Sequence, residues 1–60
     1  MRNVDRAWQY AALFNRLGDR WRVNVPVDAT TSTDGRTVYL SSGWRVERDD
    51  DGRWTARLPS

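Results

Sequence analysis

Side chains with catalytic potential are few in this chain of 60 residues. It contains no histidine, cysteine or lysine, so the common general bases, thiol nucleophiles and Schiff-base amines are absent. The hydroxyl groups of Ser32, Ser41 and Ser42 have no such base to activate them. The single glutamate, Glu47, stands among arginines, which indicates an ion pair rather than a catalytic acid. We therefore expect no enzymatic activity.

One run of acidic residues could offer oxygen ligands to a metal: Asp49, Asp50 and Asp51, followed by Gly52. A calcium-binding loop needs ligands at several spaced positions and usually a closing glutamate. This run is short, it is flanked by arginines, and its Asp-Gly end is typical of a tight hairpin turn. The glycines are isolated, so no glycine-rich phosphate-binding loop is present. We expect no bound metal and no cofactor.

Arginine is a second source of binding chemistry. All ten basic residues are arginine, against eight acidic residues, which gives a net charge of +2. On one face of the predicted sheet, guanidinium groups could bind phosphates and a tyrosine could stack on a base. The outer face of a sheet must be polar in any case, and a charge of +2 is small for a nucleic-acid footprint. Nucleic-acid binding is therefore the alternative hypothesis, with the residues Arg20, Arg22, Tyr39, Arg45, Arg53 and Arg57.

The predicted N-terminal helix has an apolar arc that is wider than one small sheet can cover. At about 100° per residue, one stripe holds Val4, Ala7, Trp8, Ala11 and Phe14. Tyr10 and Leu17 widen this stripe on one side, and Leu13 lies outside it among polar residues. Apolar patches of this kind often mark a partner or dimer interface. The leading hypothesis is therefore a protein-binding surface of Tyr10, Leu13 and Leu17, which contacts a partner protein or a second copy of the chain.

Periodicity and turn residues predict the elements that position these side chains. Residues 3–17 are predicted to form a helix, with Asn3 as the N-cap, Asp5 in the first turn and Gly18 after the last turn. Strict alternation of polar and apolar residues over 20–25 predicts the first strand. A polar loop over 27–35 follows, and further strands are predicted at 36–40, 44–48 and 53–58.

This order predicts one α+β domain over residues 1–60, with an N-terminal helix packed on one face of a three- to four-stranded antiparallel β-meander in two layers. All four tryptophans fall in phase with apolar neighbours, so all four are expected in the core. In strand 36–40, Tyr39 falls on the arginine face, and Arg36 is expected to turn into solvent at the strand end. The expected core face of the sheet is Trp21, Val23, Val25, Val38, Leu40, Trp44, Val46, Trp54, Ala56 and Leu58.

Composition also predicts the location of the protein and the kind of organism that encodes it. The longest apolar run is short, and the first five residues lack the apolar segment of a signal peptide, so we expect a cytoplasmic protein without membrane association. Arginine codons are GC-rich and lysine codons are AT-rich, so the absence of lysine predicts a high-GC bacterium or one of its phages. We expect a small non-enzymatic binding or regulatory protein.

Overall fold

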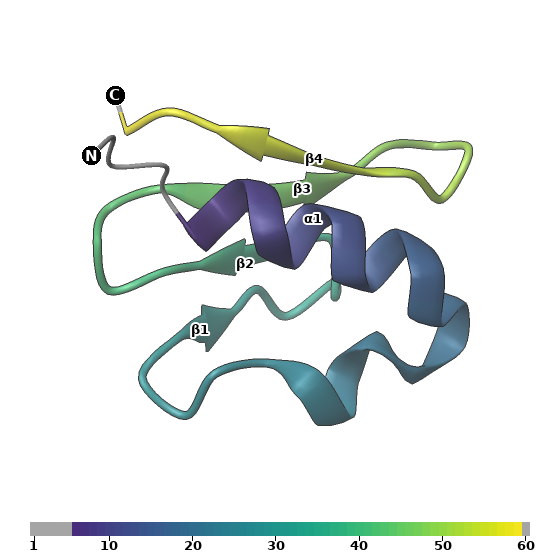
Figure 1. The fold of residues 1–60 in the computed structure, drawn as a ribbon, viewed down its shortest axis with the longest axis horizontal. Coiled ribbons are helices and arrows are strands. Elements are labelled where there is room, and N and C mark those ends of the chain that lie inside the picture. The colour runs from purple at the N-terminus through teal and green to yellow at the C-terminus, as the bar shows by residue number, and fades with distance from the viewer. Residues whose placement is uncertain (1–5, 60) are drawn as a thin grey trace.

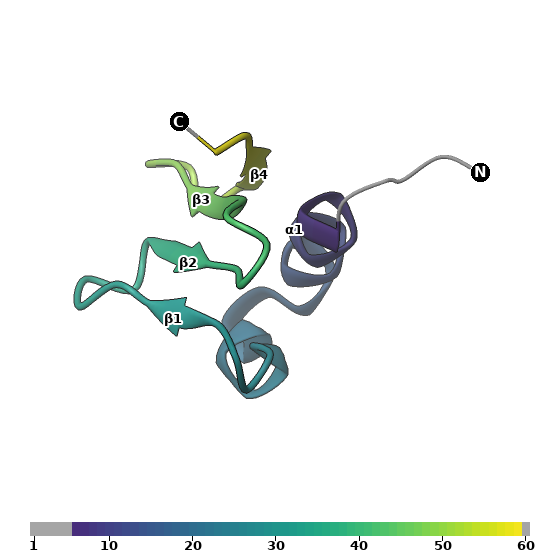
Figure 2. The ribbon, with the colours of Figure 1, turned by 90° about the vertical axis from the view of Figure 1, so that its left-hand side faces the viewer.

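A computed structural model describes residues 6–59 and confirms the predicted fold class. One helix packs on one face of a four-stranded antiparallel sheet (Figures 1 and 2). In chain order the elements are the α-helix α1 Arg6–Leu17, the 3-10 helix η1 Gly18–Asn24, and the strands β1 Thr30–Thr31, β2 Thr37–Tyr39, β3 Arg45–Arg48 and β4 Trp54–Arg57.

Helix α1 agrees with the prediction over the part of the chain that the structure describes. The predicted N-cap Asn3, together with Val4 and Asp5, lies outside the described residues. The helix ends where Gly18 adopts a φ of 60°, a left-handed conformation that glycine takes without a Cβ penalty. Within residues 6–59, no helix has the length and apolar character needed to span a bilayer.

The four strands form a simple meander in the order β1-β2-β3-β4, and every neighbouring pair is antiparallel. The turn residues explain the tight connections, because Gly35, Gly43 and Gly52 all adopt positive φ. Helix α1 packs against β3 and β4, and its N-terminal half lies beside the end of β4 (Figure 1). The other half of the sheet faces η1 and the loop that follows it (Figure 2).

The predicted strand over residues 20–25 is wrong. This segment forms η1, and only Trp21 is buried in it, whereas Val23 is 82% exposed. Trp21 packs into the core from η1, and Val25 packs against the core just after η1, where the backbone is extended. The first strand of the sheet is instead β1, which lies inside the segment predicted as a polar loop over 27–35.

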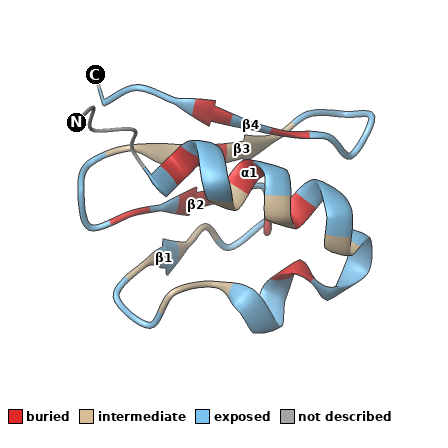
Figure 3. Cartoon of the chain, viewed as in Figure 1, coloured by how far each residue is buried: buried red, intermediate tan, exposed pale blue. Residues whose placement is uncertain are grey.

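An aromatic cluster around Phe14 forms the centre of the core. Buried positions lie on α1, η1 and the strands β2, β3 and β4 (red in Figure 3). The Phe14 ring lies 5.0 Å from Trp54 and 5.9 Å from Trp21, measured between ring centroids. The two tryptophan rings are 4.8 Å apart, and all three side chains are at most 3% exposed. Burial of such rings contributes strongly to the stability of a chain that has no cysteine and therefore no disulfide. The other buried hydrophobic residues of 6–59 are Ala7, Ala11, Val38, Leu40, Val46 and Ala56.

Three residues that the sequence assigns to the core are exposed. Trp8 is 54% exposed and Leu58 is 66% exposed, and Val23 faces solvent from η1. Trp44 is half-buried and packs against the core from its margin. The helix approaches the sheet through two small residues, Ala7 and Ala11, together with Phe14. Because Trp8 lies about 100° round the helix from Ala7, it falls beside the sheet and not over it.

Arg48 closes the core at the end of β3. Its guanidinium carbon lies 5.6 Å from the centre of the Trp21 ring and 5.3 Å from that of Trp54. Its Nη2 atom also donates a hydrogen bond to the Gly35 carbonyl oxygen at 3.1 Å. Gly35 is itself buried with a φ of 73°, and a Cβ there would lie 2.8 Å from Nη2 of Arg22. These contacts hold the β1–β2 turn against the aromatic cluster.

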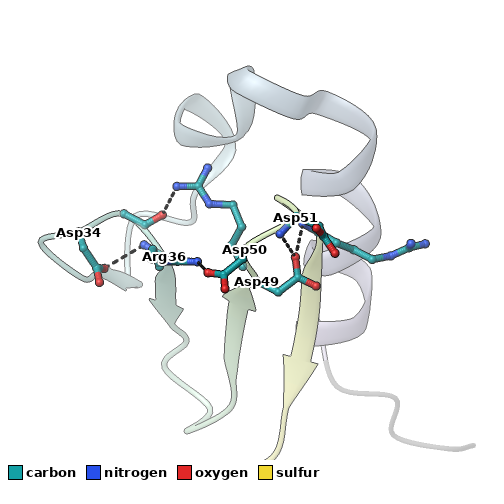
Figure 4. A network of polar contacts seen from close by, with 8 residues as sticks. Asp34, Arg36, Asp49, Asp50 and Asp51 are labelled. Carbon is teal, nitrogen blue, oxygen red and sulfur yellow. Dashed lines mark hydrogen bonds and ion pairs between the residues drawn. The ribbon is translucent and has the colours of Figure 1, made fainter.

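Aspartates organise the turns at one end of the sheet (Figure 4). The Asp34 carboxylate accepts a hydrogen bond from the Ser32 hydroxyl at 2.6 Å and another from the Arg36 backbone N–H at 3.1 Å. The Arg36 side chain turns into solvent, as the sequence predicts, and forms an ion pair with Asp50 at 2.6 Å. This pair links the β1–β2 turn to the β3–β4 turn across the sheet.

The hydrogen bonds of these aspartates should make the free energy of unfolding fall in acid. Donors from Ser32 and Arg36 lower the pKa of Asp34, and the Arg53 backbone N–H chiefly lowers the pKa of Asp49. A depressed carboxyl pKa in the folded state contributes stability above the unfolded pKa, and this contribution is lost as the pH falls below about 4. We expect the urea midpoint to fall between pH 6 and pH 3.

The double variant Asp34→Asn and Asp49→Asn should have a flatter pH profile over this range. The control Asp28→Asn, in the loop before β1, should keep the wild-type slope. Parallel profiles for the wild type and the double variant would contradict the role assigned to the two turns.

Candidate protein-binding surface

The predicted helix surface of Tyr10, Leu13 and Leu17 is present but half-buried in all three residues. The Tyr10 ring lies 5.9 Å from the Phe14 ring and packs against the core. At helical spacing, these three side chains share the side of α1 that lies away from Asn15. They form a continuous but shallow apolar strip, and much of their surface is already covered by the fold.

Part of the predicted arginine face comes together on the outer side of the sheet. The register pairs Tyr39 with Arg45 and Arg45 with Arg57, so these three residues form one row across β2, β3 and β4. We call this set the outer row. Glu47 bonds Nε of Arg45 through one carboxylate oxygen and lies 3.3 Å from Nε of Arg57 through the other. One carboxylate therefore neutralises part of the charge of both arginines.

The other predicted arginines lie elsewhere. Arg20 and Arg22 belong to η1 and not to a strand, so the prediction that they share the outer sheet face is wrong. The Arg22 guanidinium lies 4.8 Å above the Trp21 ring. Arg53 precedes β4 at the β3–β4 turn and is exposed. The six residues named for nucleic-acid binding therefore do not form one patch.

The acidic turn over Asp49, Asp50 and Asp51 has the geometry of a hairpin end. One Asp49 oxygen accepts the backbone N–H groups of Asp51 and Arg53, at 2.9 and 3.0 Å, and Asp50 is occupied by Arg36. Among residues 6–59, acidic side chains nowhere gather in a group of three that could hold a metal ion.

The edge of β4 that faces away from β3 has hydrogen-bonded backbone groups at Trp54 but not, among residues 6–59, at Ala56. Asp49 and Arg53 form a hydrogen-bonded position of the β3–β4 pair, so by alternation the N–H and C=O of Trp54 and Ala56 point away from β3. At Trp54, the Asn15 side chain takes both groups: its Nδ2 donates to the carbonyl at 3.0 Å, and its Oδ1 accepts the N–H at 2.7 Å. No strand or side chain among residues 6–59 bonds the corresponding groups of Ala56.

Helical spacing from Asn15 places Trp8 near the Ala56 end of β4. Trp8 precedes Asn15 by seven residues, so it shares a helix face with Asn15 and lies about 10.5 Å away along the axis. Helix α1 and β4 run in opposite directions (Figure 1), and Trp54 and Arg57 are separated by about 10 Å of strand. Trp8 is therefore level with Arg57 and Leu58. We call the exposed Trp8 and Leu58 side chains and the Ala56 backbone, which no other residue of 6–59 bonds, the β4-edge surface.

Sequence reasoning missed this surface because it assigned Trp8 and Leu58 to the core. One signal was available: Asn15 follows Phe14 on the flank of the helix, where a polar residue marks the limit of the buried face. Trp8 lies on that same flank. Pairing between Asn15 and a strand 39 positions later had no signal in the sequence.

Comparisons with protein families, with curated proteins and with solved structures find no match to this chain.

Proposed function

We propose that this chain is a small non-enzymatic binding protein that acts by contact with another protein. The supporting observation is the β4-edge surface, which combines a half-exposed tryptophan with backbone groups of an edge strand that no other described residue bonds. Tryptophan is enriched among residues that dominate protein interfaces, and an open strand edge is a template for pairing with another chain. Composition supports action in the cytoplasm of a high-GC bacterium or its phage.

The Tyr10, Leu13 and Leu17 strip is a smaller candidate within the same proposal. These side chains are half-buried, so they offer less apolar area than Trp8 and Leu58. A partner seated on the β4 edge needs no contact with them.

Nucleic-acid binding is the second candidate, and the outer row favours it because Tyr39, Arg45 and Arg57 lie side by side. Three observations weigh against it. Glu47 bonds both arginines of the row, Arg20 and Arg22 lie outside the sheet, and the net charge is only +2.

Site-specific photo-crosslinking in intact cells tests both candidates. A benzophenone-bearing phenylalanine analogue replaces residue 8, residue 39 or, as an exposed control, residue 33. We expect position 8 to give protein adducts of discrete mass that survive nuclease treatment and that position 33 does not give. The same adducts from positions 8 and 33, or none from position 8, would contradict protein binding at this surface. Nuclease-sensitive adducts confined to position 39 would favour the nucleic-acid candidate.

A further inference from the structure

We propose that the β4-edge surface binds an extended segment of a partner protein in which aliphatic and acidic residues alternate. The segment adds to the sheet as an antiparallel fifth strand beside β4. This inference rests on the proposed function and specifies the chemistry of the partner. Three features of the structure support it, each at a defined position: backbone groups that the described part of the chain leaves unbonded, an apolar wall and an arginine.

The backbone groups define how the segment is held. Ala56 presents its N–H and C=O outward, and extending the same alternation past the end of β4 gives the Leu58 backbone the same orientation. An antiparallel strand opposite these residues receives two hydrogen bonds at each position and continues the pattern found throughout the sheet. The opposite edge is less suitable, because β1 has only two residues.

The apolar wall defines the residues that face the helix. Ala56 points into the core, and Leu58 shares its face of the sheet. A side chain opposite either residue in the added strand therefore projects toward helix α1, where Trp8 is 54% exposed. An aliphatic side chain there covers the Trp8 ring and the exposed Leu58 side chain, which removes apolar area from water. The residues opposite Ala56 and Leu58 are thus expected to be aliphatic.

Arg57 determines the type of partner residue expected between these two aliphatic residues. It points to the outer face, and its side chain is 58% exposed despite the contact with Glu47 at 3.3 Å. Because a guanidinium has five N–H donors, one contact to Glu47 leaves several free. Arg57 and its opposite residue form the closer, non-hydrogen-bonded type of pair, with Cα atoms about 4.5 Å apart. A carboxylate at that position completes an opposite-charge pair.

A second copy of this chain fits the edge poorly. Every antiparallel register that reaches Trp54 meets the Asn15 side chain, which already bonds both backbone groups there. The register that joins Ala56 of one copy to Leu58 of the other places the two Arg57 side chains directly opposite each other. Like charges at this position destabilise the pair. The charge of the edge therefore favours an acidic partner over self-association.

The geometry also fixes which partner amides are essential. The aliphatic residues pair with Ala56 and Leu58, so their N–H groups donate to β4. The acidic residue opposite Arg57 directs its N–H away from β4. N-methylation of the aliphatic residues must therefore abolish binding, whereas N-methylation of the acidic residues must leave it within about twofold.

A blocked peptide of four Glu-Val repeats is the probe, titrated into the 15N-labelled full chain. We expect saturable shifts of the Ala56 and Leu58 amide resonances and a change in the Trp8 indole resonance. A peptide of four Lys-Val repeats should bind at least about tenfold more weakly, because it places like charges opposite Arg57. Arg57→Glu should reverse this order, and the matched control Arg16→Glu, on the exposed side of α1, should preserve it.

The N-methylated peptides test the pairing on the wild-type chain, so the result does not depend on the folding of a variant. Equal binding of the acidic and basic peptides, equal effects of the two N-methylation patterns, or shifts centred on other residues would overturn the inference. A concentration-dependent doubling of the 7.0 kDa mass that the Glu-Val peptide does not reverse would also overturn it. If neither peptide binds while position 8 still gives protein adducts, the strand-addition inference fails and the proposed function stands.

Discussion

Replacing Phe14 by alanine is expected to remove a large part of the protein's free energy of unfolding. The side chain is fully buried and contacts the rings of Trp21 and Trp54, so its removal leaves a cavity between the helix and the sheet. Phe-to-Ala changes in cores cost about 3–5 kcal/mol. A chain of this length has a free energy of unfolding of about 3–9 kcal/mol. Urea unfolding followed by circular dichroism measures the loss.

Two further variants make this result specific. Phe14→Leu keeps most of the volume and should retain a cooperative transition at a lower urea midpoint. Trp8→Ala removes a larger aromatic side chain from the same helix, but one that lies outside the aromatic cluster, so it should cost about 1 kcal/mol or less. If Trp8→Ala costs as much as Phe14→Ala, the assignment of the core is wrong.

Asn15→Leu is expected to have the second-largest effect. It removes both hydrogen bonds that the side chain makes to the Trp54 backbone and leaves an edge N–H and C=O without their partner. We expect a loss of about 1–3 kcal/mol in the free energy of unfolding. The variant also lengthens the open edge of β4, so its mass by light scattering should rise with protein concentration.

Asn24→Leu is the matched control, because Asn24 makes one exposed hydrogen bond, from Nδ2 to the Arg20 carbonyl at 3.3 Å. Its cost should stay within about 0.5 kcal/mol, and its mass should remain at 7.0 kDa. An Asn15→Leu protein that is as stable and as monomeric as this control would show that Asn15 does not protect the edge.

Local signals account for the parts of the fold that the sequence predicts correctly. The hairpin from β3 to β4 has strands of alternating pattern on either side of an Asp-Gly turn, and the burial of Val46, Trp54 and Ala56 follows from this alternation. Tyr39 also points to solvent, as the phase of strand 36–40 requires, and Arg36 turns into solvent at the strand end, as predicted. Helix α1 follows equally from apolar spacing and from Gly18.

The segment over 20–25 shows where local signals are insufficient. Alternation favours a strand there, but Trp21 must reach the Phe14 and Trp54 rings directly after the helix ends at Gly18. A helical turn brings it there within three residues, and Arg22 then covers the outer side of its ring. Tertiary packing decides this segment, so a periodicity read over six residues gives the wrong element.

The candidate surface could be predicted only in part for a related reason. The outer row of Tyr39, Arg45 and Arg57 follows from strand phase. The exposure of Trp8 depends on how α1 is rotated over the sheet, and Ala7 and Ala11 set that rotation by close approach. Periodicity shows which residues of a helix form its apolar side. It does not show which of those residues the sheet covers.

The pairing of Asn15 with Trp54 also has a consequence during synthesis. These residues are separated by 39 positions, and at about 5–20 residues per second a ribosome takes about 2–8 s to add them. During that interval α1 has no β4 to pack against, and Phe14 lacks the Trp54 ring. A newly made chain therefore passes through a period of seconds in which its apolar face is open to chaperones and to other nascent chains.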